Sequence, residues 1–220
     1  MPADQQDKSD RGRFKALAIY GGSFSPPHLG HVSAALALYR ELQPDRLLIM
    51  PSLISPREKS EPAEKSEHRV AMCRAAFEEE AGFCGRVRVS DYELSNNRVS
   101  YTYLTVDHFA DMADKLYLLM GTDMLFRLDS WKNFRGILEK ATVCFAERRE
   151  NNPQHRKETD GIIEKYRTEY GADIIRLEHD RIEISSTELR KRIESGESCS
   201  KYLPAGVEEY IRLNRLYGAK

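Results

Sequence analysis

Two histidines follow a pair of glycines near the start of the chain, in the stretch AIYGGSFSPPHLGHVSAALAL at residues 18–38. Gly21 and Gly22 come directly after an apolar run and leave the backbone without side chains, so a ligand can approach it closely. His28 and His31 lie where the pattern predicts the start of a helix, with unpaired N–H groups and a positive dipole end. This combination favours an anionic ligand, most simply a phosphate.

Two other interpretations of the histidine pair compete with phosphate binding. A zinc site needs a third ligand at a recognisable spacing, and His-x-x-His is not the spacing of the His-Glu-x-x-His zinc motif. The pair could also be purely structural. The sequence favours a phosphate over a resident metal ion and leaves the structural role open.

A cluster of hydroxyl side chains opens a predicted helix near the C-terminus, in the stretch ISSTELR at residues 184–190. Ser185 and Glu188 have the spacing of a capping box, which marks the first turn of a helix. Taken alone, the stretch is typical of a capped helix with a solvated arginine, Arg190. A contact with phosphate is the alternative, and it gains weight because the glycine and histidine stretch occurs in the same chain.

Short apolar runs alternate with amphipathic stretches, which predicts the elements that position these residues. The fold class is α/β, with a doubly wound, mostly parallel, Rossmann-like sheet and a small helical C-terminal part. Ligands bind such sheets at the carboxyl ends of the strands, where Gly21 and Gly22 would lie. Strands are predicted at 14–20, 46–51, 86–91, 115–121, 141–147 and within 174–184. Helices are predicted at 32–42, 66–81, 100–113, 133–140, 162–170, 185–196 and 206–218, with a short helical piece at 124–127.

The chain has 220 residues, a net charge of −1, 31% charged residues and 40% hydrophobic residues. This balance favours neither a nucleic acid nor an acidic membrane as partner. No run is apolar for the length of a membrane span, and the polar MPADQQDKSDRGR at the start lacks the apolar segment of a signal peptide. We therefore expect a cytoplasmic protein.

The length suits one domain with its own core. We expect a disordered tail at 1–13, a nucleotide-binding α/β core at 14–184 and a helical part of the same domain at 185–220. Four separated cysteines without a CxxC pair indicate reduced, buried thiols rather than disulfides or a zinc site: Cys73, Cys84, Cys144 and Cys199.

Five ordered motifs resemble those of the nicotinate mononucleotide adenylyltransferases, a family of the nucleotidyltransferase superfamily. GGSFSPPHLGH at 21–31 resembles the superfamily signature GGTFDPxHxGH, and ISSTELR is similar to its second signature, ISSTxIR. SYTYLTV at 100–106 resembles the family segment SYTxxTL. LLMGTD at 118–123, followed by Trp131, is similar to the GxD…W region, and YLPAGVEEYIRLNRLY resembles the usual ending. The likeness covers nearly all of residues 17–217.

The resemblance implies adenylyl transfer from ATP to nicotinate mononucleotide, giving nicotinate adenine dinucleotide and pyrophosphate in NAD biosynthesis. It implies Mg²⁺ held mainly by the ATP phosphates, so no protein metal site is expected. The catalytic residues that it implies are His28, His31 and Arg190. For ATP it implies Gly21, Gly22, Ser23, Phe24, His28, His31, Gly121, Asp123, Ser185, Ser186 and Arg190. For nicotinate mononucleotide it implies Tyr101, Thr102, Trp131 and Lys59.

The residue types fit these implied roles, although each has a plainer interpretation. Trp131 offers a flat face to a pyridinium ring, but it could equally be a core tryptophan. Asp123, after a strand and a glycine, is placed for two ribose hydroxyls, but aspartates also cap helices. Tyr101 and Thr102 could simply pack and cap the start of a helix.

Two departures from the family pattern bear on the site. Ser23 and Ser25 replace the usual Thr and Asp of the first signature; a serine can still make the local turn hydrogen bond. In PSLISPREK at 51–59 the family commonly has a Pro-Pro-His-Lys loop. Lys59 is the candidate for a phosphate-binding charge there, and Arg57 is its rival.

Other functions stay open. Within the superfamily, the acceptor could be nicotinamide mononucleotide or phosphopantetheine, or the transfer could be cytidylyl. Outside it, the chain could be a nucleotide-binding regulator without turnover, for which the altered 51–59 loop is the main argument. The pocket around Tyr101, Thr102 and Trp131 would decide whether the acceptor is the acid, nicotinate mononucleotide, or the amide, nicotinamide mononucleotide. No sequence feature indicates an oligomeric state or a role for the loop predicted at 147–160.

Overall fold

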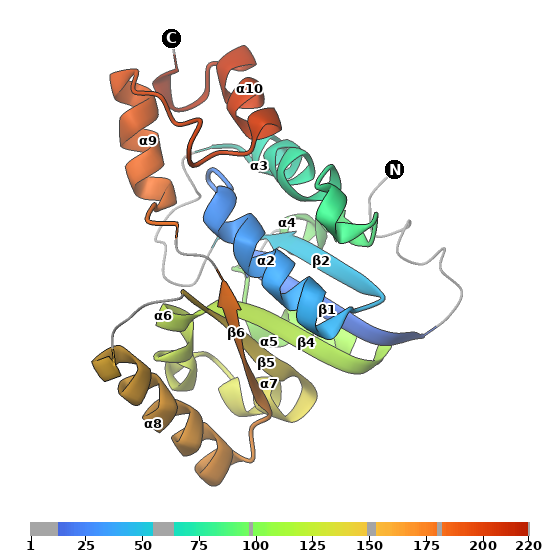
Figure 1. The fold of residues 1–220 in the computed structure, drawn as a ribbon. Helices are drawn as coiled ribbons and strands as arrows, with labels where there is room; N and C mark the ends of the chain where they lie inside the picture. The colour runs from blue at the N-terminus through green and yellow to red at the C-terminus, as the bar shows by residue number, and fades with distance from the viewer. Residues whose placement is uncertain (1–12, 55–63, 97–98, 149–152, 180–181, 220) are drawn as a thin grey trace.

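The computed structural model describes residues 13–54, 64–96, 99–148, 153–179 and 182–219 (Figure 1). They form one six-stranded sheet with helices on both faces, as the alternating pattern predicts. The strands are β1 (Phe14–Gly22), β2 (Arg46–Pro51), β3 (Val87–Val89), β4 (Ala113–Gly121), β5 (Thr142–Arg148) and β6 (Ile174–His179). The main helices are α2 (Leu29–Leu42), α3 (Ser66–Cys73), α5 (Thr102–Ala110), α7 (Phe134–Lys140), α8 (Pro153–Tyr170), α9 (Ser186–Ser195) and α10 (Ala205–Leu213). Shorter pieces are the π-helical turn η1 (Arg74–Glu78), α4 (Tyr92–Ser95), α6 (Thr122–Leu125) and the 3₁₀ turns η2 (Ala81–Phe83), η3 (Leu128–Ser130) and η4 (Leu216–Gly218).

The order of the strands creates the place where a ligand can bind. The sheet runs β3-β2-β1-β4-β5-β6, and every described pairing is parallel. The chain moves outward from β1 to β3 and then returns to β4 on the other side of β1. This switch opens a crevice between the carboxyl ends of β1 and β4. The doubly wound Rossmann-like arrangement predicted from the sequence is confirmed.

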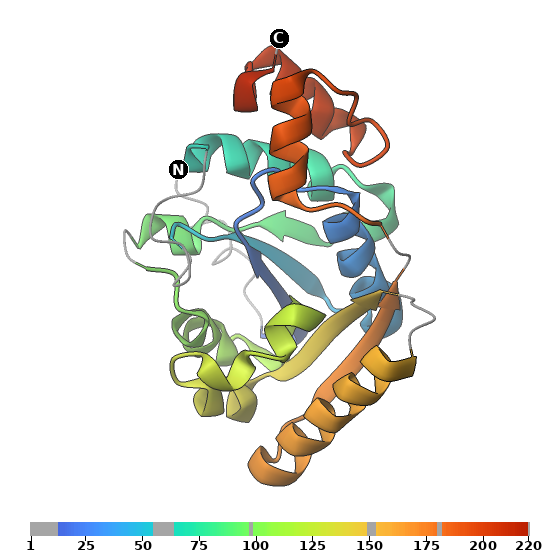
Figure 2. The same ribbon diagram turned by 90° about the vertical axis from the view of Figure 1, so that its left-hand side faces the viewer.

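Alternate residues of each strand face two separate halves of the core. Ala18 and Tyr20 of β1 pack with α2, α3, α9 and α10 on one face. Leu17 and Ile19 pack with α5, α7 and α8 on the other. Figure 2 shows these two groups of helices on opposite sides of the sheet. Leu17 and Ile19 each contribute roughly 1.5–3 kcal/mol by their burial, so packing on both faces holds the central strand in place.

The C-terminal helices belong to the same core as the sheet. Leu189 and Ile193 of α9, and Val207 and Ile211 of α10, are buried together with residues of α2 and α3. The predicted capping of α9 is confirmed: the Ser185 hydroxyl accepts from the N–H of Glu188 at 3.1 Å. Gly196 ends the helix at φ 77°, the left-handed conformation that suits glycine. The start of α9 is thereby fixed beside the carboxyl ends of the strands.

The loop predicted at 147–160 is wrong over most of its length, because α8 begins at Pro153. Proline fits the first turn of a helix, where its missing N–H would have no partner anyway. The Gln154 side chain donates to Glu158 one turn later at 2.8 Å, and Thr159 is fully buried. The polar composition of the first half of α8 concealed its helical periodicity in the sequence. No described helix combines the length and the apolar composition needed to cross a membrane.

The expectation that the cysteines are buried holds for three of the four. Cys73, Cys144 and Cys199 are buried, and burial raises the pKa of each thiol. Cys84 is exposed, which corrects the prediction. It follows the 3₁₀ turn η2 at φ 49°, in a surface turn that the apolar pattern does not mark.

Candidate nucleotide-binding site

A cavity of 1080 Å³ opens at the switch point between β1 and β4. This volume lies slightly above the usual range for small-molecule sites, about 300–1,000 Å³. The cavity brings together most of the predicted site residues, from five separate stretches of the chain: Gly21, Gly22, Ser23, His28, His31, Tyr101, Thr102, Gly121, Asp123, Trp131, Ser185 and Ser186. Phe24 and Arg190 are absent from its lining. Lys59 and its rival Arg57 lie outside the described residues.

The two histidines form one unit at the start of α2. His28 is the N-cap residue and is buried, with extended backbone angles. Its backbone N–H donates to Nδ1 of His31 at 3.2 Å, and the two ring centroids lie 3.7 Å apart. A Cβ at Gly30 would lie only 3.0 Å from the His28 ring, so the motif needs glycine there. Because Nδ1 of His31 accepts, the neutral ring carries its proton on Nε2 as a donor.

Phe24 supports the histidines instead of facing the cavity. Its side chain is 1% exposed and is absent from the cavity lining, so the structure places this side chain in the core and leaves the predicted ATP contact a prediction. The ring packs edge-on against His31, with centroids 5.2 Å apart, and against Tyr20 at 5.4 Å. A left-handed backbone, with φ 46°, turns the ring inward beneath the loop. Phe24 thus fixes the position of His31 from behind.

The two glycines of β1 have different neighbours, which predicts different effects of one substitution. A Cβ at Gly21 would meet no protein atom within 4 Å and would project into open space at the cavity. A Cβ at Gly22 would lie 3.0 Å from the Phe24 ring. We expect Gly21→Ala to weaken ATP binding by about 1–3 kcal/mol and Gly22→Ala to lower the free energy of unfolding by a similar amount. Calorimetric titration and thermal unfolding of both variants measure the two effects. Unchanged ATP affinity in Gly21→Ala would contradict a ligand contact at this position.

Residues of α9 and the C-terminus hold the loop that precedes α2. The Ser186 hydroxyl donates to the carbonyl of Pro26 at 2.9 Å, and Arg190 Nη1 donates to that of Ser25 at 2.7 Å. The Ser25 hydroxyl lies 3.2 Å from the hydroxyl of Tyr217. Ser25 stands where the family usually has aspartate, and its hydroxyl contacts a residue near the C-terminus. Because Ser185 and Ser186 line the cavity, the N–H groups at the start of α9 face the same space as the histidines.

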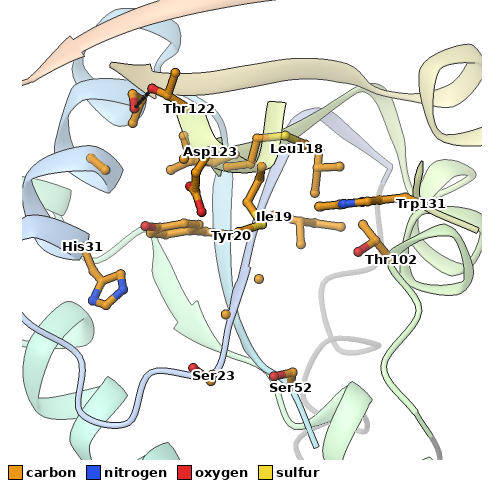
Figure 3. Close-up of a pocket in the computed structure, with 18 of the residues that line it drawn as sticks. Ile19, Tyr20, Ser23, His31, Ser52, Thr102, Leu118, Thr122, Asp123 and Trp131 are labelled. Atoms are coloured by element: carbon orange, nitrogen blue, oxygen red, sulfur yellow. Dashed lines mark hydrogen bonds between the residues drawn. The ribbon is translucent and has the colours of Figure 1, made fainter. Parts of the chain in front are cut away.

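The end of β4 contributes a carboxylate. Asp123 lies in the first turn of α6, and its Oδ1 is 2.9 Å from the position of a Cβ at Gly121. Only glycine leaves room for the carboxylate there. Thr122 fixes the turn by donating its hydroxyl to the carbonyl of Ala146 at 3.1 Å (Figure 3). Burial and the nearby Asp123 carboxylate raise the pKa of Tyr20, whose ring lies beside Asp123 in Figure 3.

The aromatic end of the cavity lies away from the histidines. Figure 3 shows Trp131 and Thr102 on one side of the pocket and His31 on the other, with Ile19 and Tyr20 between them. Trp131 is half-buried and follows η3 in an extended conformation. Thr102 is the first residue of α5. The cavity is therefore bipartite, with an anion-type end and an aromatic end.

The sequence missed several polar residues that line the cavity. Glu93 is the least expected, because it accepts from the Thr105 hydroxyl at 2.6 Å inside the aromatic half. Burial raises the pKa of Glu93, opposed by hydrogen bonds from Thr105 and Ser100. Its only sequence signal was proximity to the SYTYLTV motif. The other polar lining residues that the sequence missed are Tyr20, Ser52, Ser100, Thr105, Thr122, Ser130, Lys132, His155 and His179. Within the described part of the chain, no three His, Cys, Asp or Glu residues are grouped so as to hold a metal ion.

A glycine loop followed by two histidines, a carboxylate after β4 and a crevice at the switch point form a site of the nucleotide-binding type. The chain belongs to the cytidylyltransferase-like family, whose model matches residues 19–192. It is 32% identical over 204 residues to a probable nicotinate-nucleotide adenylyltransferase of Clostridium botulinum, covering 92% of this chain and 98% of that protein. It is 31% identical over 208 residues to one of Staphylococcus epidermidis, covering 94% and 99%.

Solved structures show the same fold. The Plasmodium falciparum nicotinic acid mononucleotide adenylyltransferase complexed with NaAD matches with a TM-score of 0.77 and 18% identity, covering 94% of this chain and 98% of that one. The complex of the same protein with APC gives a TM-score of 0.73 at 18% identity and the same coverage. The Rossmann-like architecture is therefore shared although few residues are.

Proposed function

We propose that this chain transfers the adenylyl group of ATP to nicotinate mononucleotide, releasing pyrophosphate and forming nicotinate adenine dinucleotide in NAD biosynthesis. The observation that carries this proposal is the bipartite cavity, in which an anion-type end and an aromatic end share one space. The curated relatives, which align along nearly their whole length, carry names of this activity. Both substrates are nucleotides, and a cytoplasmic location suits them.

The ATP half would be built from three stretches of the chain. The bare backbone at Gly21 admits the nucleotide, and Asp123 is placed to accept from its ribose hydroxyls. His31 would donate Nε2–H to a phosphate oxygen. The start of α9 with Ser186 would hold the departing pyrophosphate. Arg190 uses two of its N–H donors on Ser25 and Thr187, and the others would face the leaving group.

The acceptor half would hold the nicotinate ring. Trp131 offers a face for the positively charged pyridinium ring, an attraction of the cation–π type. Tyr101 and Thr102 begin α5, where backbone N–H groups point out of the helix toward an anionic substituent. These contacts would place the 5′-phosphate of the acceptor toward the middle of the cavity.

The chemistry requires positioning and charge neutralisation. A 5′-phosphate oxygen of the acceptor attacks the α-phosphorus of ATP in line, a new P–O bond forms, and the bond to the β-phosphate oxygen breaks. The attacking phosphate is already anionic at neutral pH, so no strong general base is needed. Donors fixed on the oxygens that gain charge lower the barrier. Mg²⁺ would enter with ATP as the MgATP substrate, bridging phosphate oxygens.

The test is pyrophosphate release with MgATP and, in parallel, nicotinate mononucleotide, nicotinamide mononucleotide and phosphopantetheine. We expect strong turnover with nicotinate mononucleotide and weak turnover with the other two. Turnover with phosphopantetheine alone would contradict the acceptor pocket while keeping the phosphate site. ATP binding without pyrophosphate release from any acceptor would identify a regulator instead of an enzyme.

A further inference from the structure

Lys132 stands out among the charged residues of the cavity. It is the one lysine or arginine among the described residues that line this space. The acidic residues of the lining are Glu93 and Asp123, and no described carboxylate forms an ion pair with Lys132. Lys132 is exposed at the rim of this space, so its ammonium group is available to an anionic group of a ligand that enters the cavity.

The position of Lys132 is fixed by aromatic side chains of α5 and its N-cap. Its Nζ lies 4.6 Å from the ring centroid of Tyr101 and 5.9 Å from that of Tyr103. The ammonium group is attracted to the faces of both rings, which restricts a long and flexible side chain. Asn133, the next residue, has a left-handed backbone at φ 52° and turns the chain into α7. The side chain of Lys132 is thereby held against Tyr101.

The place of Lys132 within the cavity indicates which anion it meets. It follows Trp131, which lies at the end of the pocket away from His31 (Figure 3). Phosphates belong to the His31 end. An anionic group at the Trp131 end must come from the aromatic ring of the acceptor. A ring carboxylate has that charge, and the corresponding amide has none.

We infer that Lys132 selects an acceptor nucleotide whose ring carries a carboxylate over one whose ring carries an amide. This inference rests on the proposed function, because it assigns the aromatic end to the acceptor. Glu93 in the same half is hydrogen-bonded by Thr105, which holds its carboxyl group in a contact within the protein. Lys132 is a specificity-determining residue, and the chemistry at the α-phosphorus does not depend on it.

The experiment measures kcat/KM for nicotinate mononucleotide and nicotinamide mononucleotide with Lys132→Met, Lys132→Arg and the parent chain. Lys132→Met should lower kcat/KM for the acid about tenfold, the size of one charge-assisted hydrogen bond, and change that for the amide less than twofold. Lys132→Arg should keep most of the preference. The matched control is Arg135→Gln: Arg135 is exposed, its guanidinium carbon lies 5.3 Å from the Tyr170 ring centroid, and it is outside the cavity lining.

The outcomes separate this inference from the proposed function. If the parent chain does not use nicotinate mononucleotide at all, the proposed function fails first. A second outcome is that the parent chain uses it while Lys132→Met lowers kcat/KM equally for the acid and the amide. In that case Lys132 acts on a shared phosphate or on Tyr101, and the inference is overturned. The inference is also overturned if the ratio of kcat/KM for the acid to kcat/KM for the amide is the same in Lys132→Met and in the parent chain. If Arg135→Gln lowers kcat/KM for nicotinate mononucleotide as much as Lys132→Met does, the effect belongs to net charge, and the inference is overturned.

Discussion

Replacing His31 by asparagine is expected to lower kcat about 10²- to 10³-fold, the usual cost of removing one donor to a developing negative charge. The hydrogen bond from the His28 N–H to Nδ1 of His31 leaves Nε2 as the donor of the neutral ring. Asparagine has an amide at the Nδ1 position and can keep that local bond. It has no group at the Nε2 position, so the proposed contact with phosphate is lost, together with the ring contacts to His28 and Phe24.

Glutamine provides the matched comparison, because its amide reaches the Nε2 position. His31→Gln should therefore recover part of the lost kcat, whereas His31→Asn should not. Pyrophosphate release measured at saturating MgATP gives kcat, and binding of ATP to each variant separates affinity from rate. Thermal unfolding should change little in either variant, because Phe24 keeps its ring contacts with Tyr20 and Phe77 beneath the loop. A His31→Asn variant with undiminished kcat would show that this ring takes no part in the transition state.

The parts of the site that could be predicted from sequence are those encoded in short local patterns. Gly21, Gly22 and the two histidines lie within one strand–loop–helix, so their proximity follows from periodicity and spacing alone. The capping of α9 by Ser185 is local in the same sense. The doubly wound, mostly parallel sheet was also accessible, since strands that alternate with helices favour it, whereas the order of its strands was not predicted.

Residues brought together by tertiary packing could not be predicted in the same way. Glu93 and Lys132 share one cavity, but both lie outside the motifs that marked the predicted site residues. Phe24 lies inside the first motif, but its side chain is buried in the core and supports the motif from there, which the local pattern does not reveal. His179 illustrates a signal that was available, since it ends β6 at the edge where ligands bind.

Arg69 is the strongest case of a residue without a local signal. It lies on α3 and is 1% exposed. Its Nη1 donates to the carbonyl of Ser23 at 3.0 Å and to that of Ser52 at 2.7 Å, and its Nε donates to the carbonyl of Glu64 at 3.2 Å. Ser23 follows β1 and Ser52 follows β2, and both line the cavity. One buried guanidinium thus joins the ends of two strands beneath the nucleotide site.

Replacing Arg69 by methionine is expected to lower the free energy of unfolding by about 3 kcal/mol, because three carbonyl groups lose their donor in the interior. For a chain of this size that corresponds to a fall in Tm of roughly 6–12 °C. Arg74→Met is the matched control, since Arg74 lies one turn further on the same helical segment and is exposed. Its effect should stay within about 0.5 kcal/mol. Urea unfolding of both variants measures the difference.

A second measurement distinguishes a role in positioning the site from a role in stability alone. Well below the lowered Tm, the folded Arg69→Met variant should still have a raised KM for ATP, because the Ser23 and Ser52 carbonyls lose the guanidinium donor that they share. Arg69→Lys should recover part of the free energy of unfolding, since an ammonium group can donate to some of the same carbonyls. It should restore the position of the loop less well, because lysine lacks the planar guanidinium that donates to all three. If folded Arg69→Met binds ATP like the parent chain, the guanidinium stabilises the fold without shaping the loop. A raised KM that persists in the folded variant shows that the position of the phosphate loop depends on a contact made 46 residues away along the chain.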